Sequence, residues 1–316
     1  MTKETFLVTG ALGCIGAWVV RNLVQAGTPV VAFDASDDMR RLKMILGPEQ
    51  VAAVTHVQGD ITDFSALERV FDAHAITHVV HLAALLLPAC RANPVLGERV
   101  NVGGTVNIFE AAARRKGGVQ RIVFASSIAV FDVADVAQGQ TVTHDLPGRP
   151  ANLYGVYKQA MEGVARVYWQ EHGLSSMGLR PATVFGVGRD NGITAAPTKA
   201  MQAAAHAQAF HIPYGGRGEF QYADDVAKTF ITCARARFAG SDVFNLHGSV
   251  AHMREVITMI EAAAPEVRGK ITFDEPGFPS PEEFDASALA HVIGRVPNTP
   301  MDQAVRETVA LFRQLP

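Results

Sequence analysis

The chain has 316 residues, of which 48% are hydrophobic and 19% charged, a composition that excludes a disordered protein. Its length corresponds to about two domains of ordinary size. The net charge of −3 gives no basic surplus for binding nucleic acid or an anionic membrane. Three scattered cysteines without metal-type spacing indicate a reducing compartment and no metal site. We therefore expect a cytoplasmic protein without a membrane span.

Short apolar runs alternate with longer segments of helical period along the chain. The predicted strands are Thr5–Thr9, Pro29–Phe33, Val54–Val57, His78–Leu82, Arg121–Ala125, Met177–Arg180 and Val243–Leu246. The predicted helices are Ile15–Gln25, Phe64–Asp72, Val100–Arg114, Tyr154–Glu171, Pro197–Ala207 and Asp224–Arg237. Alternating strands and helices form βαβ units, and continuously apolar strands are typical of a sheet covered on both faces. The sequence predicts an α/β fold, a Rossmann-type doubly wound parallel sheet.

Three glycines separate the first predicted strand from the first predicted helix, at Gly10, Gly13 and Gly16. In such a turn one glycine makes the bend, one lets the backbone approach a pyrophosphate, and one lets helix and strand pack closely. The helix N-terminus, with Cys14 and Ile15, then presents free N–H groups and a positive dipole end to the phosphates. The segment therefore predicts a dinucleotide site.

Asp34 follows the second predicted strand, 18 residues after Gly16. A carboxylate at this position accepts a hydrogen bond from a ribose 2′-hydroxyl and repels a 2′-phosphate, which favours NAD over NADP. Arg40 and Arg41 lie close enough in the sequence to leave NADP open, although a solvated helix face is the simpler interpretation of these two arginines.

The GxxGxxG spacing resembles the short-chain dehydrogenase/reductase superfamily, and further motifs resemble its extended branch, the NAD-dependent epimerase/dehydratase-like family. The matching segments are Gly59-Asp60-Ile61, His81-Leu82-Ala83-Ala84, Asn101 to Thr105, Tyr154 to Lys158 and Arg180-Pro181. Besides the glycine loop, the resemblance implies coenzyme contacts from Asp34, Asp60, Ile61, Leu82, Ala83, Ala84, Asn101, Ala125, Tyr154, Lys158 and Pro181. It also implies a homodimer formed through the Asn101 and Tyr154 helices.

Tyr154 and Lys158 stand four residues apart on one predicted helix and therefore share a face. A Lys ammonium beside a phenol stabilises the phenolate and lowers its pKa from about 10. Such a tyrosine can take the proton of a hydroxyl that is being oxidised. The resemblance implies Ser127 as the hydrogen-bond donor to the reacting oxygen, with Ser126 as the alternative by one residue. We expect Tyr157 to pack on another helix face.

The resemblance implies either a dehydrogenase, in which hydride stays on NAD, or an epimerase or dehydratase, in which hydride returns to a nucleotide sugar. Thr183 stands where nucleotide-sugar members usually carry Asn, and the usual Arg-Asp pair is altered to Arg217 and Glu219. Arginine is the geometric match for a diphosphate, so the displaced arginine weakens the nucleotide-sugar interpretation. Arg189 and Arg217 nevertheless remain possible contacts of an anionic substrate.

We therefore expect a dehydrogenase of a secondary alcohol on a sugar, sugar acid or similar small polyhydroxy compound, and a nucleotide-sugar epimerase or dehydratase as the alternative. Expected substrate contacts are Leu85, Ser127, Thr183, Arg189 and Arg217. After Arg180 the strand–helix alternation loosens. We predict that residues 1–180 and about 221–247 bind NAD, while about 181–220 and 248–316 form a smaller, mostly helical substrate-binding domain.

Overall fold

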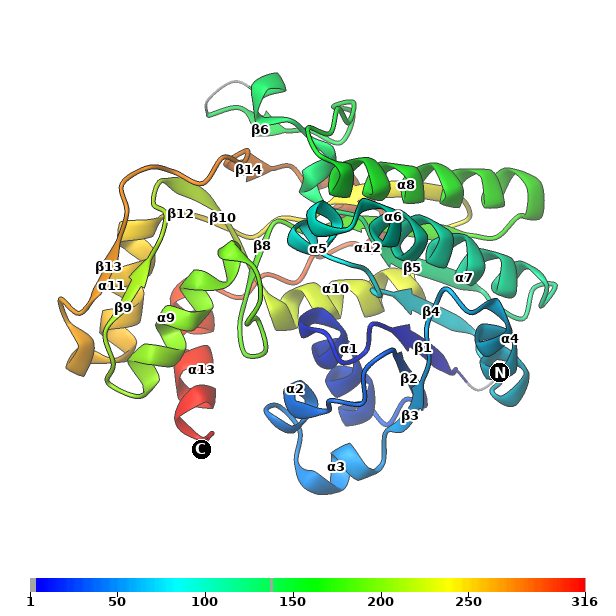
Figure 1. Ribbon diagram of the computed structural model, residues 1–316, viewed down its shortest axis with the longest axis horizontal. Helices are drawn as coiled ribbons and strands as arrows, with labels where there is room; N and C mark the ends of the chain where they lie inside the picture. The colour runs from blue at the N-terminus through cyan, green and yellow to red at the C-terminus, as the bar shows by residue number, and fades with distance from the viewer. Residues whose placement is uncertain (1–3, 137–138, 316) are drawn as a thin grey trace.

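The computed structural model describes residues 4–136 and 139–315. Its centre is a seven-stranded parallel sheet of strand order β11-β7-β5-β4-β1-β2-β3 (Figure 1). The strands are β1 (Phe6–Thr9), β2 (Val30–Asp34), β3 (Thr55–Gln58), β4 (His78–His81), β5 (Arg121–Ala125), β7 (Ser176–Arg180) and β11 (Ser241–Asn245). The strand order reverses between β1 and β4, so the crevice outside their carboxyl ends is the expected ligand site. The predicted fold class is confirmed.

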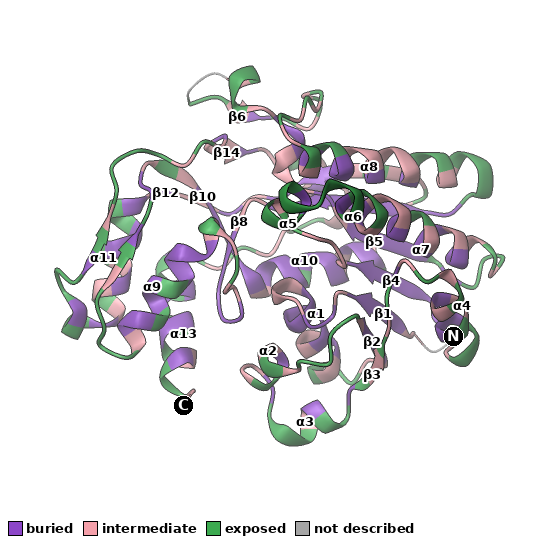
Figure 2. Cartoon of the chain, in the orientation of Figure 1, coloured by how far each residue is buried: buried purple, intermediate pink, exposed green. Residues whose placement is uncertain are grey.

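Helices cover both faces of this sheet, because successive side chains of each strand point to opposite sides. Val8 and Val123 face α1 (Cys14–Gln25) and α10 (Ala223–Arg235), which pack against each other. Leu7 and Ile122 face the other layer, in which α4 (Phe64–Ala73), α7 (Gly104–Ala113) and α8 (Leu153–His172) pack side by side. Figure 2 shows the buried surfaces of these helices turned toward the sheet.

The chain leaves the large sheet after β7 and returns to it for β11. Between and after these strands it forms a three-stranded sheet of order β12-β10-β8 and the parallel pair β13-β9. A second parallel pair joins β14 to β6, which precedes β7 in the chain. These strands are β6 (Thr141–Val142), β8 (Thr183–Phe185), β9 (Phe210–Ile212), β10 (Arg217–Tyr222), β12 (Ser249–His252), β13 (Ile271–Phe273) and β14 (Glu283–Phe284). The accompanying helices are α9 (Ala196–Ala205), α11 (Met253–Ala263), α12 (Ser287–Ile293) and α13 (Met301–Arg313). The domain division remains a prediction.

The predicted helix Val100–Arg114 is divided in the structure. Residues Arg99–Gly103 form a π-helical turn, and α7 begins only at Gly104. The wider turn carries Asn101, whose buried side chain bonds to a neighbouring loop. The remaining short helices are α2 (Arg40–Lys43), α3 (Pro48–Ala52), α5 (Leu87–Ala92) and α6 (Pro94–Glu98), with 3-10 turns at Ile128–Val130, Val133–Asp135, Ile193–Ala195 and Pro265–Val267.

Candidate active site

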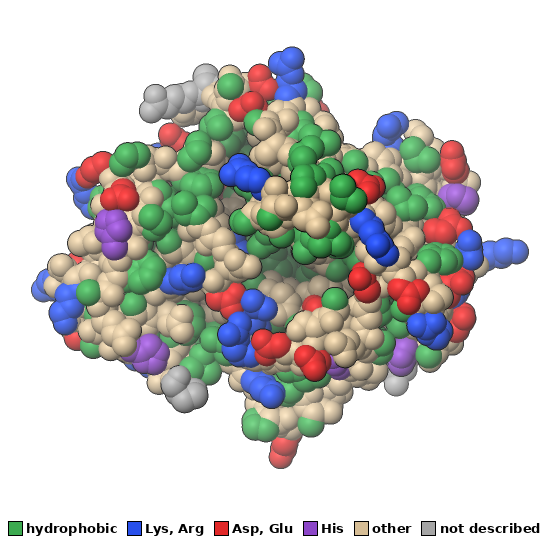
Figure 3. Space-filling view, in the orientation of Figure 1, with side chains coloured by type: hydrophobic (Ala, Val, Ile, Leu, Met, Phe, Trp, Pro, Cys, Tyr) green, Lys and Arg blue, Asp and Glu red, His purple; other side chains and the backbone are tan. Residues whose placement is uncertain are grey.

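A cavity of about 740 Å³ opens at the carboxyl ends of β1, β4, β5 and β7. Figure 3 shows it as a hollow in the centre of one face, with hydrophobic side chains along its upper rim. It is lined by many of the residues that the sequence singles out: Gly10, Gly13, Cys14, Ile15, Gly16, Leu82, Ala84, Ala125, Ser127, Tyr154, Lys158, Pro181, Thr183 and Arg189.

The glycine loop leaves no room for side chains. Gly10 has a φ of +66°, and a Cβ there would lie 2.6 Å from the Ala83 backbone nitrogen. A Cβ on Gly16 would lie 2.1 Å from the Gly10 carbonyl oxygen. Burial raises the pKa of the Cys14 thiol to about 11, so Cys14 fills space as a neutral group. The bare backbone at the start of α1 is a cradle that fits the pyrophosphate of a dinucleotide.

Asp34 ends β2 beside this loop. Its Oδ2 accepts a hydrogen bond from the Leu12 backbone N–H at 2.9 Å, and its Oδ1 accepts one from the Ser36 N–H at 3.0 Å. The carboxylate is therefore held at the edge of the glycine loop, where the ribose of a dinucleotide would lie.

Tyr154, Lys158 and Ser127 meet at the end of β5 and the first turns of α8. The Lys158 ammonium, only 2% exposed, donates to the Ala125 carbonyl oxygen at 2.7 Å and lies 5.7 Å from the Tyr154 ring centroid. The Ser127 hydroxyl accepts from the Ala129 N–H at 3.1 Å. The structure thus brings the three predicted catalytic side chains together on the cavity wall.

Burial is the largest cause of the pKa shifts of Tyr154 and Lys158. It raises the pKa of Tyr154, against which the hydrogen bond with Ser127 and the charge of Arg189 act. It lowers the pKa of Lys158 to about 8, although the neighbouring Glu162 carboxylate opposes the shift. The expected lowering of the tyrosine pKa by Lys158 is thus not found, because desolvation is the largest cause for both groups.

The two serines have different partners. The Ser126 hydroxyl bonds to Oε1 of Glu162, whose carboxylate also accepts two hydrogen bonds of 2.8 Å from the Arg180 guanidinium. Ser127 is therefore the serine directed to Tyr154. Sequence reasoning missed Glu162, although its position four residues after Lys158 on the same helix was a usable signal.

The His81 and Asn101 motifs brace the cavity floor. The Thr105 hydroxyl donates to the Asn101 carbonyl oxygen at 2.6 Å, so it accepts from Nε2 of His81 at 3.0 Å. The other nitrogen of His81 then accepts from the Thr9 hydroxyl at 2.7 Å. Burial lowers the pKa of His81 to about 3, which keeps the ring neutral. The Asn101 amide binds both the N–H and the carbonyl oxygen of Leu85.

Several predicted contacts lie outside the large cavity. Asp60 is exposed and accepts from the Thr62 N–H, while Ile61 is buried against α7. Arg217 lies 4.0 Å from Glu282 and lines a neighbouring cavity of about 620 Å³. Ala83, Leu85, Asn101 and Asp34 support the wall without lining it.

Part of the remaining cavity lining is apolar, beside polar and charged residues such as Arg91, Asp132 and Asn191. Leu86, Val133 and Ile193 expose 37%, 39% and 52% of their surface there. Further apolar lining residues are Leu87, Ile128, Phe131, Phe278, Pro279 and Pro281. The segment around Phe278 comes from the Pro-rich part of the tail. Its position at the cavity could not be predicted from the sequence, because long-range strand pairing brings it here.

Among the described residues, 4–136 and 139–315, no helix is long and apolar enough to cross a bilayer. They also contain no group of three or more His, Cys, Asp or Glu side chains that could hold a metal ion.

The chain is similar in sequence to UDP-sugar 4-epimerases. The chain is 28% identical to a UDP-glucose 4-epimerase from Azospirillum brasilense, over 100% of the chain and 95% of that protein. It is 33% identical to UDP-glucuronate 4-epimerase 5 from Arabidopsis thaliana, over 71% of the chain and 52% of that relative. The chain thus spans about half the length of this second relative.

Solved structures of the same fold include an epimerase and a dehydrogenase. A Thermus thermophilus UDP-glucose 4-epimerase in complex with NAD is 26% identical, with a TM-score of 0.81 over 99% of this chain and 100% of that one. An L-threonine dehydrogenase from Cupriavidus necator is 21% identical, with a TM-score of 0.82 over 97% and 99% of the two chains, a likeness that shows the fold alone. The family model described as "NAD dependent epimerase/dehydratase family" matches residues 6–246. The chain therefore belongs to the NAD-dependent epimerase/dehydratase family, in the extended branch of the short-chain dehydrogenases/reductases.

Proposed function

We propose that this protein is an NAD-dependent dehydrogenase that oxidises a secondary alcohol on a compact substrate. One observation carries the proposal: Ser127, Tyr154 and Lys158 line the same cavity as the glycine loop. A hydroxyl held at Tyr154 therefore lies within one cavity of a dinucleotide held at Gly10 to Gly16, so acid–base and hydride chemistry meet at one carbon.

In the proposed mechanism Tyr154 takes the proton of the substrate hydroxyl and Ser127 donates a hydrogen bond to the same oxygen. When bound, NAD supplies the hydride acceptor. Lys158, fixed by the Ala125 carbonyl, holds its ammonium 5.7 Å from the centroid of the Tyr154 ring, on the same cavity wall. Glu162 binds Ser126 and Arg180 behind this group, and it acts with Cys90 against the lowering of the lysine pKa by burial.

The coenzyme contacts follow from the same geometry. Gly10, Gly13 and Gly16 would hold the pyrophosphate, because side chains at Gly10 and Gly16 would collide with the backbone that shapes the loop. Asp34 would accept from the ribose 2′-hydroxyl and repel a 2′-phosphate, which supports NAD over NADP.

The apolar part of the cavity lining restricts the class of substrate that the site can bind. A sugar or sugar acid needs many hydrogen-bonding partners, whereas Leu86, Val133 and Ile193 offer exposed hydrocarbon. Arg189 lines the cavity, and its buried Nε has no partner among the described residues. We therefore favour an alcohol with an apolar arm and an anionic group over the polyhydroxy compound expected from the sequence.

A nucleotide-sugar 4-epimerase is the second candidate, and the similarity to the Azospirillum brasilense enzyme along the whole chain favours it. Against it, Arg217 lies outside the large cavity and beside Glu282. Glu219 is 2% exposed, and its Oε2 accepts from the Phe284 N–H at 2.9 Å. These two side chains thus already have acidic or backbone partners, although the cavity that Arg217 lines shares Val133 and residues 278–281 with the large one.

One experiment separates the candidates. The protein is incubated with NAD⁺ and a panel of hydroxy acids, sugar acids and nucleotide sugars, and NADH absorbance and products are both followed. Net NADH supports the dehydrogenase, and product without net NADH supports the epimerase. Tight NAD binding with neither result would reject both.

We also propose a homodimer through α7 and α8. This side of the molecule exposes a series of apolar side chains: Val95 and Leu96 of α6, Val106 of α7, and Val156 and Val167 of α8. Such a patch is typical of a protein interface. Val156→Glu should shift the protein to monomer in size-exclusion chromatography, whereas Ile193→Glu, in the cavity wall, should leave the oligomeric state unchanged.

A further inference from the structure

We propose that Asp190 sets the choice of coenzyme by neutralising the charges of Arg40 and Arg41 beside the 2′-position of the coenzyme ribose. The inference rests on the coenzyme site of the proposed function, but it concerns a residue from the opposite side of the cavity. Asp190 belongs to the loop that follows β8, about 150 positions from the two arginines.

All three nitrogens of the Arg41 guanidinium are engaged. Nη2 donates to Oδ1 of Asp190 at 2.7 Å, Nε donates to the Gly188 carbonyl oxygen at 3.1 Å, and Nη1 donates to the Leu12 carbonyl oxygen at 2.9 Å. The side chain is only 23% exposed. The protein thus uses three of the five N–H groups of Arg41, which also lines the large cavity.

Leu12 shows how near Arg41 lies to the ribose site. Its N–H donates to the Asp34 carboxylate and its carbonyl oxygen accepts from Arg41. The carboxylate expected to bind the 2′-hydroxyl and the guanidinium able to bind a 2′-phosphate thus contact one residue of the glycine loop. An arginine at this distance is a ready phosphate ligand once its charge is free.

Arg40 uses the other oxygen of the same carboxylate. Its Nη2 donates to Oδ2 of Asp190 at 3.1 Å, although its side chain is 62% exposed. Asp190 thus neutralises two neighbouring cations with one carboxylate. Without Asp190, Arg41 would keep no ion pair among the described residues and Arg40 would keep only the one with Asp38 at 4.0 Å. More positive charge would then lie beside Asp34, where a 2′-phosphate carries its negative charge.

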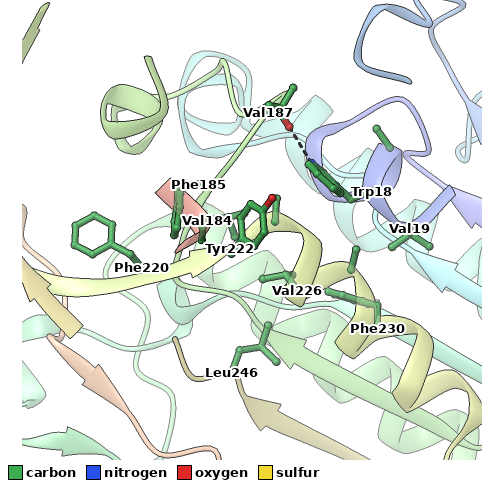
Figure 4. Close-up of a cluster of buried hydrophobic side chains, with 14 of the residues drawn as sticks. Trp18, Val19, Val184, Phe185, Val187, Phe220, Tyr222, Val226, Phe230 and Leu246 are labelled. Atoms are coloured by element: carbon green, nitrogen blue, oxygen red, sulfur yellow. Dashed lines mark hydrogen bonds between the residues drawn. The ribbon is translucent and has the colours of Figure 1, made fainter. Parts of the chain in front are cut away.

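The Asp190 loop has anchors that do not depend on this carboxylate. The Trp18 indole N–H donates to the Val187 carbonyl oxygen at 2.9 Å (Figure 4), and the Gly186 N–H donates to the Thr198 hydroxyl at 3.2 Å. Replacing Asp190 by asparagine should therefore release the arginine charges while the loop keeps its place.

The test is the binding of NADH and NADPH, measured by fluorescence titration of the purified full chain without substrate. We expect Asp190→Asn to tighten NADPH binding roughly tenfold while NADH binding changes less than about threefold. The gain should shrink at high salt, because exposed charges are screened. Asp37→Asn is the matched control: it removes the same charge from the loop after β2, and within the described residues Asp37 makes no ion pair with either arginine.

The ratio of the NADPH and NADH dissociation constants decides the proposal. Removing both arginines in the Asp190→Asn background, as Arg40→Gln and Arg41→Gln, should cancel the NADPH gain. An unchanged ratio of the two dissociation constants, or equal weakening of both coenzymes, would overturn the proposal, as would a wild-type chain that binds neither. If the ratio shifts but no alcohol of the panel yields NADH, the inference stands and only the proposed reaction fails.

Discussion

The two sides of the cavity are built differently. On the coenzyme side, backbone and closely packed neighbours define the surface: a Cβ on Gly16 would lie 2.1 Å from a carbonyl oxygen, and Lys158 is fixed by the carbonyl of Ala125. On the other side, side chains from distant elements hold the backbone, as Glu219 holds Phe284 and Arg41 and Trp18 hold the loop of residues 186–190. The comparison suggests that the first side serves a constant ligand and the second determines which substrate fits.

The sharpest test of the coenzyme side is Tyr154→Phe. It removes the proposed acid–base group, so turnover should fall by about 10³-fold, within the range for such groups. NADH binding should stay nearly unchanged, because the glycine loop is untouched. Tyr157→Phe is the matched control, since that hydroxyl donates to the Pro94 carbonyl on another face of α8. Retained turnover in Tyr154→Phe, measured by NADH absorbance, would remove the tyrosine from the mechanism.

Lys158 gives the second test, through stability and pH. Its pKa is lowered from 10.5 to about 8, so burial of the charged form costs stability below pH 8. That cost, about 3 kcal/mol from the size of the shift, should disappear as the pH rises from 8 to 10.5.

The free energy of unfolding of the wild type should therefore rise relative to that of Lys158→Met across this window. Urea denaturation of both proteins at pH 7 and pH 10 measures the difference. A gap between the two proteins that does not change with pH would refute the assignment of a destabilising charge.

An alanine substitution should be poorly tolerated at Gly16 of the glycine loop and well tolerated at Gly163 of α8. Gly16→Ala should abolish coenzyme binding and cost about 1–3 kcal/mol of stability, because its Cβ meets backbone atoms. Gly163→Ala on α8 meets nothing within 4 Å and should stabilise the helix by about 1 kcal/mol. Thermal melting with and without NADH separates the two. Equal melting temperatures for the two variants, with and without NADH, would mean that the loop can accept a side chain at Gly16.

The smallest effect belongs to the opposite wall. Ile193→Ser removes hydrocarbon that a bound substrate would cover, so KM should rise by up to about tenfold, the equivalent of burying one aliphatic side chain. NADH binding and stability should not change, since the side chain is 52% exposed. A parallel loss of NADH affinity would erase the distinction between the two sides of the cavity.

The sequence allowed most of the large sheet to be predicted, because each strand and helix has a local period. Strand β5 matches its predicted bounds, and the glycine loop and the Tyr154–Lys158 pair depend on short spacings that a sequence displays directly. The ion pair of Glu162 with Arg180, that of Asp190 with Arg41, and the place of the Phe278 segment could not be predicted in the same way, although the spacing of Glu162 from Lys158 places it on the same helix face. Each depends on contacts between positions far apart, which no local pattern encodes.

The Asn101 side chain has a consequence for binding kinetics. Its amide accepts from the Leu85 N–H at 2.7 Å and donates to the Leu85 carbonyl oxygen at 3.0 Å, as the backbone of an adjacent strand would. The loop that leads to Leu86 and Leu87 is thus ordered before any substrate arrives. Its conformational entropy is lost during folding rather than on binding, which favours rapid, rigid docking of the apolar part of the substrate.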